Sequence, residues 1–120
     1  MVTVLFDGGG AVGGGMVDVI VEEIHPHDVL YGRGAGVSGH PGNIRFRQLV
    51  RRYQPEYAAA PKMKKADVAR TIVSHIRNLD PPGRFLFNRG HDFGEEAWID
   101  VGDDRAREKT SQALREKLVA

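Results

Sequence analysis

The 120-residue sequence contains no cysteine, and none of its apolar runs approaches the roughly 20 residues of a membrane-spanning helix. The absence of cysteine excludes disulfides, thiolate zinc sites and a thiol nucleophile, and it suits a reducing compartment. The apolar stretch at the N-terminus is interrupted by Asp7 and by glycines and has no basic leader, so it does not resemble a secretory signal. We therefore expect an intracellular protein that is not inserted in a membrane.

Basic residues are absent from the first 27 positions, and this makes the charge distribution uneven. Residues 1–27 contain four acidic and no basic residues, residues 28–79 contain ten basic and three acidic residues, and residues 80–120 contain seven basic and nine acidic residues. The three segments therefore carry −4, +7 and −2, which together give the +1 of the chain. A basic middle third is typical of a phosphate-binding surface, although a solvated helical face produces the same pattern.

Length and an apolar fraction of 41% fit one globular domain. Residues 1–15 end in a glycine-rich stretch that is typical of a flexible tether. Residues 16–24 are rich in valine and isoleucine, which predicts a short strand or a segment that pairs only in context. We expect residues 1–27 to be a flexible N-terminal segment and residues 28–120 to form a compact α+β domain.

Two helices are predicted in the basic middle of the chain. The first covers about residues 43–53, where apolar residues recur at helical spacing, with Asn43 as N-cap and Pro55 helping to end it. The second begins at Pro61 and extends to about residue 79. Three lysines crowd its first turn, where the helix macrodipole favours acids, and this mismatch indicates a functional demand.

A hairpin and a last helix complete the predicted domain. Residues 84–87 and 97–101 predict two antiparallel strands, and a helix begins at residue 103 or 104 and ends near residue 118. The apolar stripe of this helix is thin, so we expect it to be partly detached or to pack on a partner. Three helices and a hairpin resemble a winged helix loosely, because a winged helix places its hairpin last.

Short motifs follow one another along residues 28–116. They are DVLYGRG at 28–34, HPGN at 40–43 with FR at 46–47, GRFL at 83–86, WIDV at 98–101 and AREKTSQALR at 106–115. Together they resemble a domain-of-unknown-function family that is abundant in diatoms and related algae. The resemblance implies no activity. Members often carry long polar flanks, which implies a regulatory or nuclear protein.

Two stretches match the pattern GxGxxG, at residues 8–13 and 34–39. A dinucleotide site needs a strand before the glycines, a helix directly after them and a surrounding βαβ unit. The first stretch precedes a β-branched segment and the second lacks the parallel-sheet context, so we expect no cofactor. The second loop can still approach an anion, with Arg33 and His40 adding polar contacts. It can equally serve only as a turn, with Arg33 bound to an acid.

No catalytic or metal-binding set is predicted, and we expect no enzyme. His25 and His27 lie near Asp28 without further metal ligands. Ser38 lies too close to a loop histidine to form a nucleophile and base pair, and no third group is evident. His75 lies beside the apolar face of the second helix, which predicts a structural role.

The candidate nucleic-acid site combines phosphate-binding bases from the middle of the chain with base-reading side chains from the last helix. The residues of the glycine loop, the two helices and the hairpin are Arg33, His40, Asn43, Arg45, Arg47, Arg51, Arg52, Lys62, Lys64, Lys65 and Arg84. Those of the last helix are Arg105, Lys109, Ser111, Gln112 and Arg115. A solvated surface is the alternative interpretation of Lys109 and Gln112.

The sequence therefore predicts a non-catalytic, duplex-DNA-binding domain of a nuclear regulatory protein. Two other functions stay open. The thin apolar face of the last helix and any exposed aromatics would dock a protein partner or a second copy of the chain. Phe85, Phe87 and Trp98 would stack on bases of single-stranded RNA if they are exposed, and for most of them a position in the core is the alternative.

Overall fold

The computed structural model describes residues 5–6, 18–90 and 96–116. The predicted glycine tether, most of the loop predicted after residue 88 and the last residues of the predicted final helix lie outside this part of the chain. In chain order the elements are β1 (Leu5–Phe6), β2 (Asp18–Val19), β3 (Val29–Leu30), α1 (Ala35–Ser38), α2 (Pro41–Ala59), the 3-10 turn η1 (Lys62–Lys64), α3 (Lys65–Arg77), β4 (Phe85–Asn88), β5 (Trp98–Asp100) and α5 (Asp103–Arg115).

Strands β3, β4 and β5 form a three-stranded sheet in which β4 is central, with β3 on one side and β5 on the other. The predicted hairpin is present, since β4 and β5 are antiparallel with Phe87 opposite Ile99. On the other side β3 pairs parallel to β4, with Val29 opposite Phe85. The parallel pair was not predicted, because a two-residue strand has no periodicity to detect.

The chain before β3 also reaches this sheet. Ile20 forms an antiparallel bridge with Ile99, and the N–H of Val21 donates to the carbonyl oxygen of Trp98 at 2.8 Å. Ahead of it, β1 and β2 form a separate antiparallel pair. The part of the predicted N-terminal segment that begins at residue 20 therefore continues along β5.

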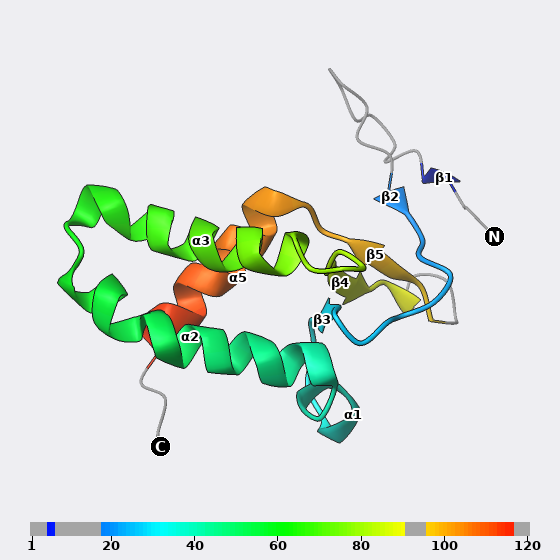
Figure 1. The fold of residues 1–120 in the computed structure, drawn as a ribbon. Coiled ribbons are helices and arrows are strands. Elements are labelled where there is room, and N and C mark those ends of the chain that lie inside the picture. Colours follow the sequence, from blue (N-terminus) through cyan, green and yellow to red (C-terminus); the bar gives the residue numbers. More distant parts are fainter. Residues whose placement is uncertain (1–4, 7–17, 91–95, 117–120) are drawn as a thin grey trace.

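Helices α2, α3 and α5 pack against one another at one end of the sheet (Figure 1). Phe46, Val50 and Ile72 are buried where they meet, and the Phe46 and Phe85 rings join helix to sheet in an edge contact with centroids 6.1 Å apart. The result is the small compact α+β domain that the sequence predicts. None of the helices in residues 18–90 and 96–116 combines the length and apolar character needed to span a bilayer.

The first long helix is longer than predicted, because α2 begins at Pro41 and continues to Ala59. Pro55 lies inside it, on the exposed side, although proline removes an internal hydrogen bond. Burial of Tyr57, two residues after the proline, favours continuation of the helix. Asn43, the predicted N-cap, lies within the first turn, and His40 occupies the cap position.

The last two helices also differ from expectation. Pro61 does not open α3 but precedes the separate turn η1, and α3 ends at Arg77. The expectation of a detached last helix is wrong, because α5 packs on both α2 and α3. Small side chains explain this close approach, since Ala106 and Thr110 are fully buried and the Thr110 hydroxyl donates to the Ala106 carbonyl at 2.7 Å.

Candidate nucleic-acid interface

Arg84, one of the predicted site residues, is held inside the domain by a buried carboxylate. Asp28 is fully buried, and its two oxygens accept hydrogen bonds from the backbone N–H, Nε and Nη2 of Arg84 at 3.1, 3.0 and 2.8 Å. The hydrogen bond with Asp28 raises the pKa of Arg84 above its ordinary value. This guanidinium ties the segment before β3 to the start of β4.

The HPGN motif also has structural roles. A Cβ atom on Gly42 would overlap the carbonyl oxygen of Asp28, so only glycine permits this approach of α2 to the strand. The Asn43 side chain accepts from the Leu30 N–H at 2.8 Å and donates to the Leu30 carbonyl at 2.9 Å. The polar atoms of this predicted site residue are therefore occupied by β3.

The glycine-rich loop is built as a turn between β3 and α2. Gly32 and Gly34 adopt positive φ values of 126° and 107°. His40 Nε2 lies 3.1 Å from the His25 carbonyl oxygen, while the Arg33 side chain is exposed. Contrary to the sequence prediction, the loop does have a parallel-sheet context, because the strand before it, β3, pairs parallel with β4. The helix directly after the glycines is only the four-residue α1.

The strongest concentration of exposed positive charge lies on α2. Its solvent side carries three exposed arginines, one partly buried arginine and one acid, which are Arg47, Arg51, Arg52, Arg45 and Glu56. Arg47 Nη2 donates to the Ser38 carbonyl at 2.8 Å. Arg51 and Arg52 are exposed and make no hydrogen bond or ion pair with the described residues. The predicted phosphate-binding arginines therefore occupy one helix surface.

The three lysines after α2 separate into two roles. Lys62 and Lys64 are exposed on η1. Lys65 turns back, so that its Nζ donates to the Tyr57 carbonyl at 2.6 Å and lies 4.7 Å from the centroid of the Tyr57 ring. A cation at the C-terminal carbonyls of α2 is favourable, which offsets the mismatch at the start of α3.

Two basic clefts border these helices. Between α2 and α3, a cleft of about 290 Å³ is lined by Arg45, Gln48, Leu49, Arg52 and His75. Between η1, the start of α3 and α5, a cleft of about 400 Å³ is lined by Tyr57, Lys62, Lys65, Ala66, Arg107, Glu108, Ser111 and Arg115. Sequence reasoning missed Arg107 and assigned His75 to structure, because the opposite wall of each cleft comes from an element that is distant in the chain.

The family model for a domain of unknown function, DUF6824, matches residues 28–116, about three quarters of the chain. The chain belongs to the DUF6824 family. No curated protein and no solved structure matches it. Family membership names no activity, and the motif residues Asp28, Gly42, Asn43 and Arg84 have the structural contacts described above.

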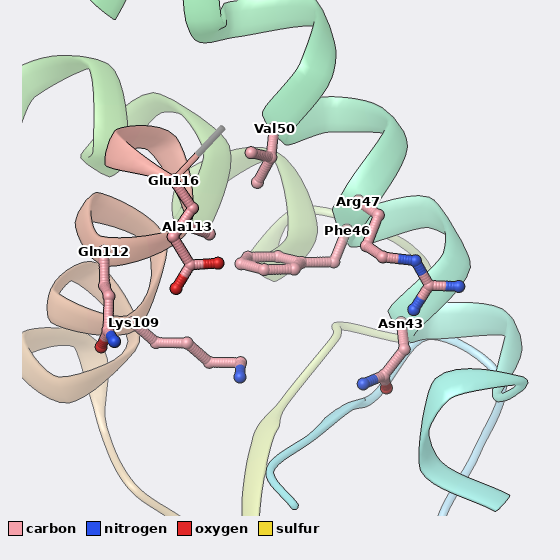
Figure 2. A pocket seen from close by; sticks show the side chains of 8 residues that line it. All are labelled: Asn43, Phe46, Arg47, Val50, Lys109, Gln112, Ala113 and Glu116. Carbon is pink, nitrogen blue, oxygen red and sulfur yellow. The ribbon is translucent and has the colours of Figure 1, made fainter. Parts of the chain in front are cut away.

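In this DUF6824 domain Lys109 does not point outward from α5. It lies in a groove of about 300 Å³ between α2 and α5, which the Phe46 ring and the Lys109 side chain enter from opposite sides (Figure 2). Its Nζ is 4.4 Å from the centroid of the Tyr31 ring and 5.8 Å from that of Phe46. Burial lowers the pKa of Lys109. This lysine contributes to packing through cation–π contacts.

The other predicted residues of α5 are divided between burial and solvent. Ser111 is buried, whereas Arg105, Gln112 and Arg115 are exposed. The exposed charged side chains of α5 comprise two bases and three acids, which are Arg105, Arg115, Asp103, Asp104 and Glu108. Its surface therefore has mixed charge, unlike that of α2. Gln54, which sequence reasoning missed, donates to the Glu116 carbonyl at 2.7 Å and ties the end of α5 to α2.

The aromatic residues of the hairpin also differ in their exposure to solvent. Phe85 is fully buried and Trp98 is half-buried. Phe87 is 41% exposed, and its ring makes an edge contact with Tyr31 at 6.3 Å between centroids. Within residues 18–90 and 96–116 no group of three or more histidines or carboxylates is placed to hold a metal ion.

Proposed function

We propose that this domain binds nucleic acid, with duplex DNA favoured, as the non-catalytic part of a nuclear regulatory protein. The observation that carries the proposal is the arginine-rich solvent face of α2. Six bases of the α2 and η1 region, Arg45, Arg47, Arg51, Arg52, Lys62 and Lys64, are not engaged in an ion pair with a described acid, whereas Glu56 is the one acid of these two elements. Such a surface attracts phosphates strongly.

The shape of α2 suits a DNA groove. With 19 residues and a rise of about 1.5 Å per residue it is about 28 Å long. At about 100° per residue, Arg47 lies on one flank of its exposed ridge and Arg45 and Arg52 lie on the other, with Gln48 between them. The major groove, about 12 Å wide, admits a helix in this orientation. The arginines would then meet phosphates on both sides, and Gln48 would face base edges.

The mixed surface of α5 supports the base-reading role less well than α2 does. A phosphate-binding face requires a surplus of positive charge, and α5 exposes more acids than bases. Lys109, which the sequence predicted as a site residue, lies in the groove beside α2, and Ser111, another predicted residue, is buried. We therefore assign the primary DNA contact to α2.

The experiment that tests this assignment compares two matched pairs of substitutions. Arg51→Gln with Arg52→Gln removes two exposed charges from α2, and Arg105→Gln with Arg115→Gln removes two from α5. We expect the α2 pair to weaken duplex binding about tenfold or more at about 50 mM salt, and the α5 pair to change it less than about threefold. Fluorescence anisotropy measures both, and circular dichroism verifies the fold. Equal losses in both pairs would contradict the assignment to α2.

Single-stranded RNA binding by the hairpin is a second candidate, because Phe87 is a large exposed aromatic beside Tyr31. Stronger binding to single-stranded RNA than to duplex DNA, lost in Phe87→Ala, would favour it. Protein docking loses one of its two bases, since the apolar face of α5 packs on α2 and α3, whereas Phe87 is an exposed aromatic. The other large exposed apolar residues of the described chain, Val19, Ile44 and Met63, are scattered over three elements.

A further inference from the structure

The cleft between α2 and α3 has an unusual chemical lining. Arg45 and Arg52 contribute guanidinium groups from α2, His75 contributes an imidazole from α3, and Gln48 contributes an amide. Leu49 supplies its apolar surface, and among the residues that the structure describes no carboxylate lines it. Positive and neutral donors therefore converge here without an acidic partner.

One of these donors is buried without an acceptor. Nη1 of Arg45 is inaccessible to solvent and has no hydrogen-bond partner among the described residues. A buried donor of a charged group is costly to leave unpaired, and folded proteins satisfy nearly all such groups. Arg45 therefore lines the cleft with a guanidinium that no described acid neutralises, and a phosphate reaches its buried Nη1 only when the side chain shifts.

We propose that this cleft binds a phosphate group through Arg45, Arg52 and His75. Phosphate is the anion that matches the lining, because it offers several oxygens to two planar guanidinium forks and one imidazole. The cleft lies on the α3 side of the basic face of α2. A bound phosphate could therefore belong to a DNA backbone that contacts this face, or to a free phosphate compound. Only the first source rests on the proposed function.

The test is a titration with inorganic phosphate, followed by nuclear magnetic resonance of the His75 imidazole. We expect saturable shifts at millimolar phosphate and no saturation with chloride at equal ionic strength. Arg45→Gln and Arg52→Gln should each weaken binding about fivefold or more, because each removes a charged fork. Arg70→Gln is the matched control, since Arg70 is an exposed arginine of α3 that does not line the cleft and lies outside the proposed DNA-binding face. It should leave the dissociation constant unchanged.

Several outcomes would overturn the proposal. A linear response to phosphate would show no site, and an equal loss in Arg70→Gln would show only general charge attraction. If Arg45→Gln does not fold, Arg52→Gln still tests the proposal, because that side chain is exposed and its replacement does not open the core.

A second test measures the stability of the domain without phosphate. Arg45→Met should not lower Tm, since it removes an unpaired donor and keeps the apolar stem of the side chain. A clear fall in Tm would mean that Nη1 is satisfied within the fold.

A competition step separates the two sources. If duplex DNA displaces inorganic phosphate from the His75 signal, the cleft holds a backbone phosphate. If phosphate saturates the site and duplex does not bind, the cleft proposal stands and the DNA-binding function fails. If duplex binds wild type while inorganic phosphate gives no saturation, the cleft proposal fails and the DNA-binding function stands.

Discussion

Replacing Asp28 with asparagine removes the negative partner of a buried ion pair while keeping the size of the side chain. The carboxylate is fully buried and accepts three hydrogen bonds from Arg84 and one from the His25 N–H, whereas the Arg84 side chain is 28% exposed. Breaking a buried pair costs about 3–5 kcal/mol, and the partial exposure of Arg84 places the expected loss near the lower end, about 3 kcal/mol.

Urea unfolding followed by the fluorescence of Trp98, the single tryptophan, measures this loss. With an m-value of about 2 kcal/mol/M, the midpoint falls by about 1.5 M. Asp67→Asn is the matched control, because it breaks the exposed pair with Arg70 and should cost less than about 1 kcal/mol.

The double variant Asp28→Asn with Arg84→Met removes both partners. It should lose at least about 1 kcal/mol less stability than the sum of the single variants, since no charge is left unpaired. Strict additivity, or a loss below about 1 kcal/mol for Asp28→Asn alone, would refute the assignment of Arg84 to the structure of the domain.

Three further predictions concern packing and pH. Gly42→Ala should cost about 3 kcal/mol or prevent folding because its Cβ meets a backbone carbonyl, whereas Gly36→Ala, with open space around it, should change stability by less than about 1 kcal/mol in the same urea assay. Burial disfavours the Asp100 carboxylate, but hydrogen bonds from Arg77 and a backbone N–H outweigh this and lower its pKa. The ionised Asp100 carboxylate stabilises the fold at pH values above the ordinary pKa of an aspartate. This stabilisation is lost as the pH falls through the lowered pKa of the folded state. Asp100→Asn should therefore reduce the fall of Tm at acid pH. Burial raises the pKa of Tyr31 to about 12. Ultraviolet titration should therefore show a phenol step near pH 12 that Tyr31→Phe removes, and stability should fall between about pH 10 and 12; a single step at about pH 10 for all tyrosines would contradict it.

The sequence predicted those parts of the fold that have a local pattern. Apolar spacing located α2 and α3, and the hairpin signal located β4 and β5. The parallel pairing of Val29 with Phe85 joins residues 56 positions apart, and a two-residue strand gives no signal of its own. The tight packing of α5 also escaped prediction, because small residues such as Ala106 add little to an apolar stripe while allowing close contact.

The candidate site was predictable to a similar extent. Helical spacing placed the α2 arginines away from the apolar stripe, and the structure shows them on its solvent face. The spacing of residues in the sequence does not reveal hydrogen-bond partners that are distant in the chain. Arg84 and Asn43 were therefore predicted as site residues, although their side chains are hydrogen-bonded to Asp28 and to the backbone of Leu30. Charge alone equally failed to separate Lys65, which caps α2, from Lys62, which is exposed.

The salt dependence of duplex DNA binding by the wild-type chain tests the central claim most directly. Four α2 arginines, each neutralising one phosphate at a slope of about −0.9, predict a slope of about −3.6 for the logarithm of the association constant against the logarithm of salt concentration. Affinity should then fall about 150-fold between about 50 and 200 mM salt. A flat dependence, or no binding at the lower concentration, would contradict the account and reduce the basic face of α2 to a solvated surface.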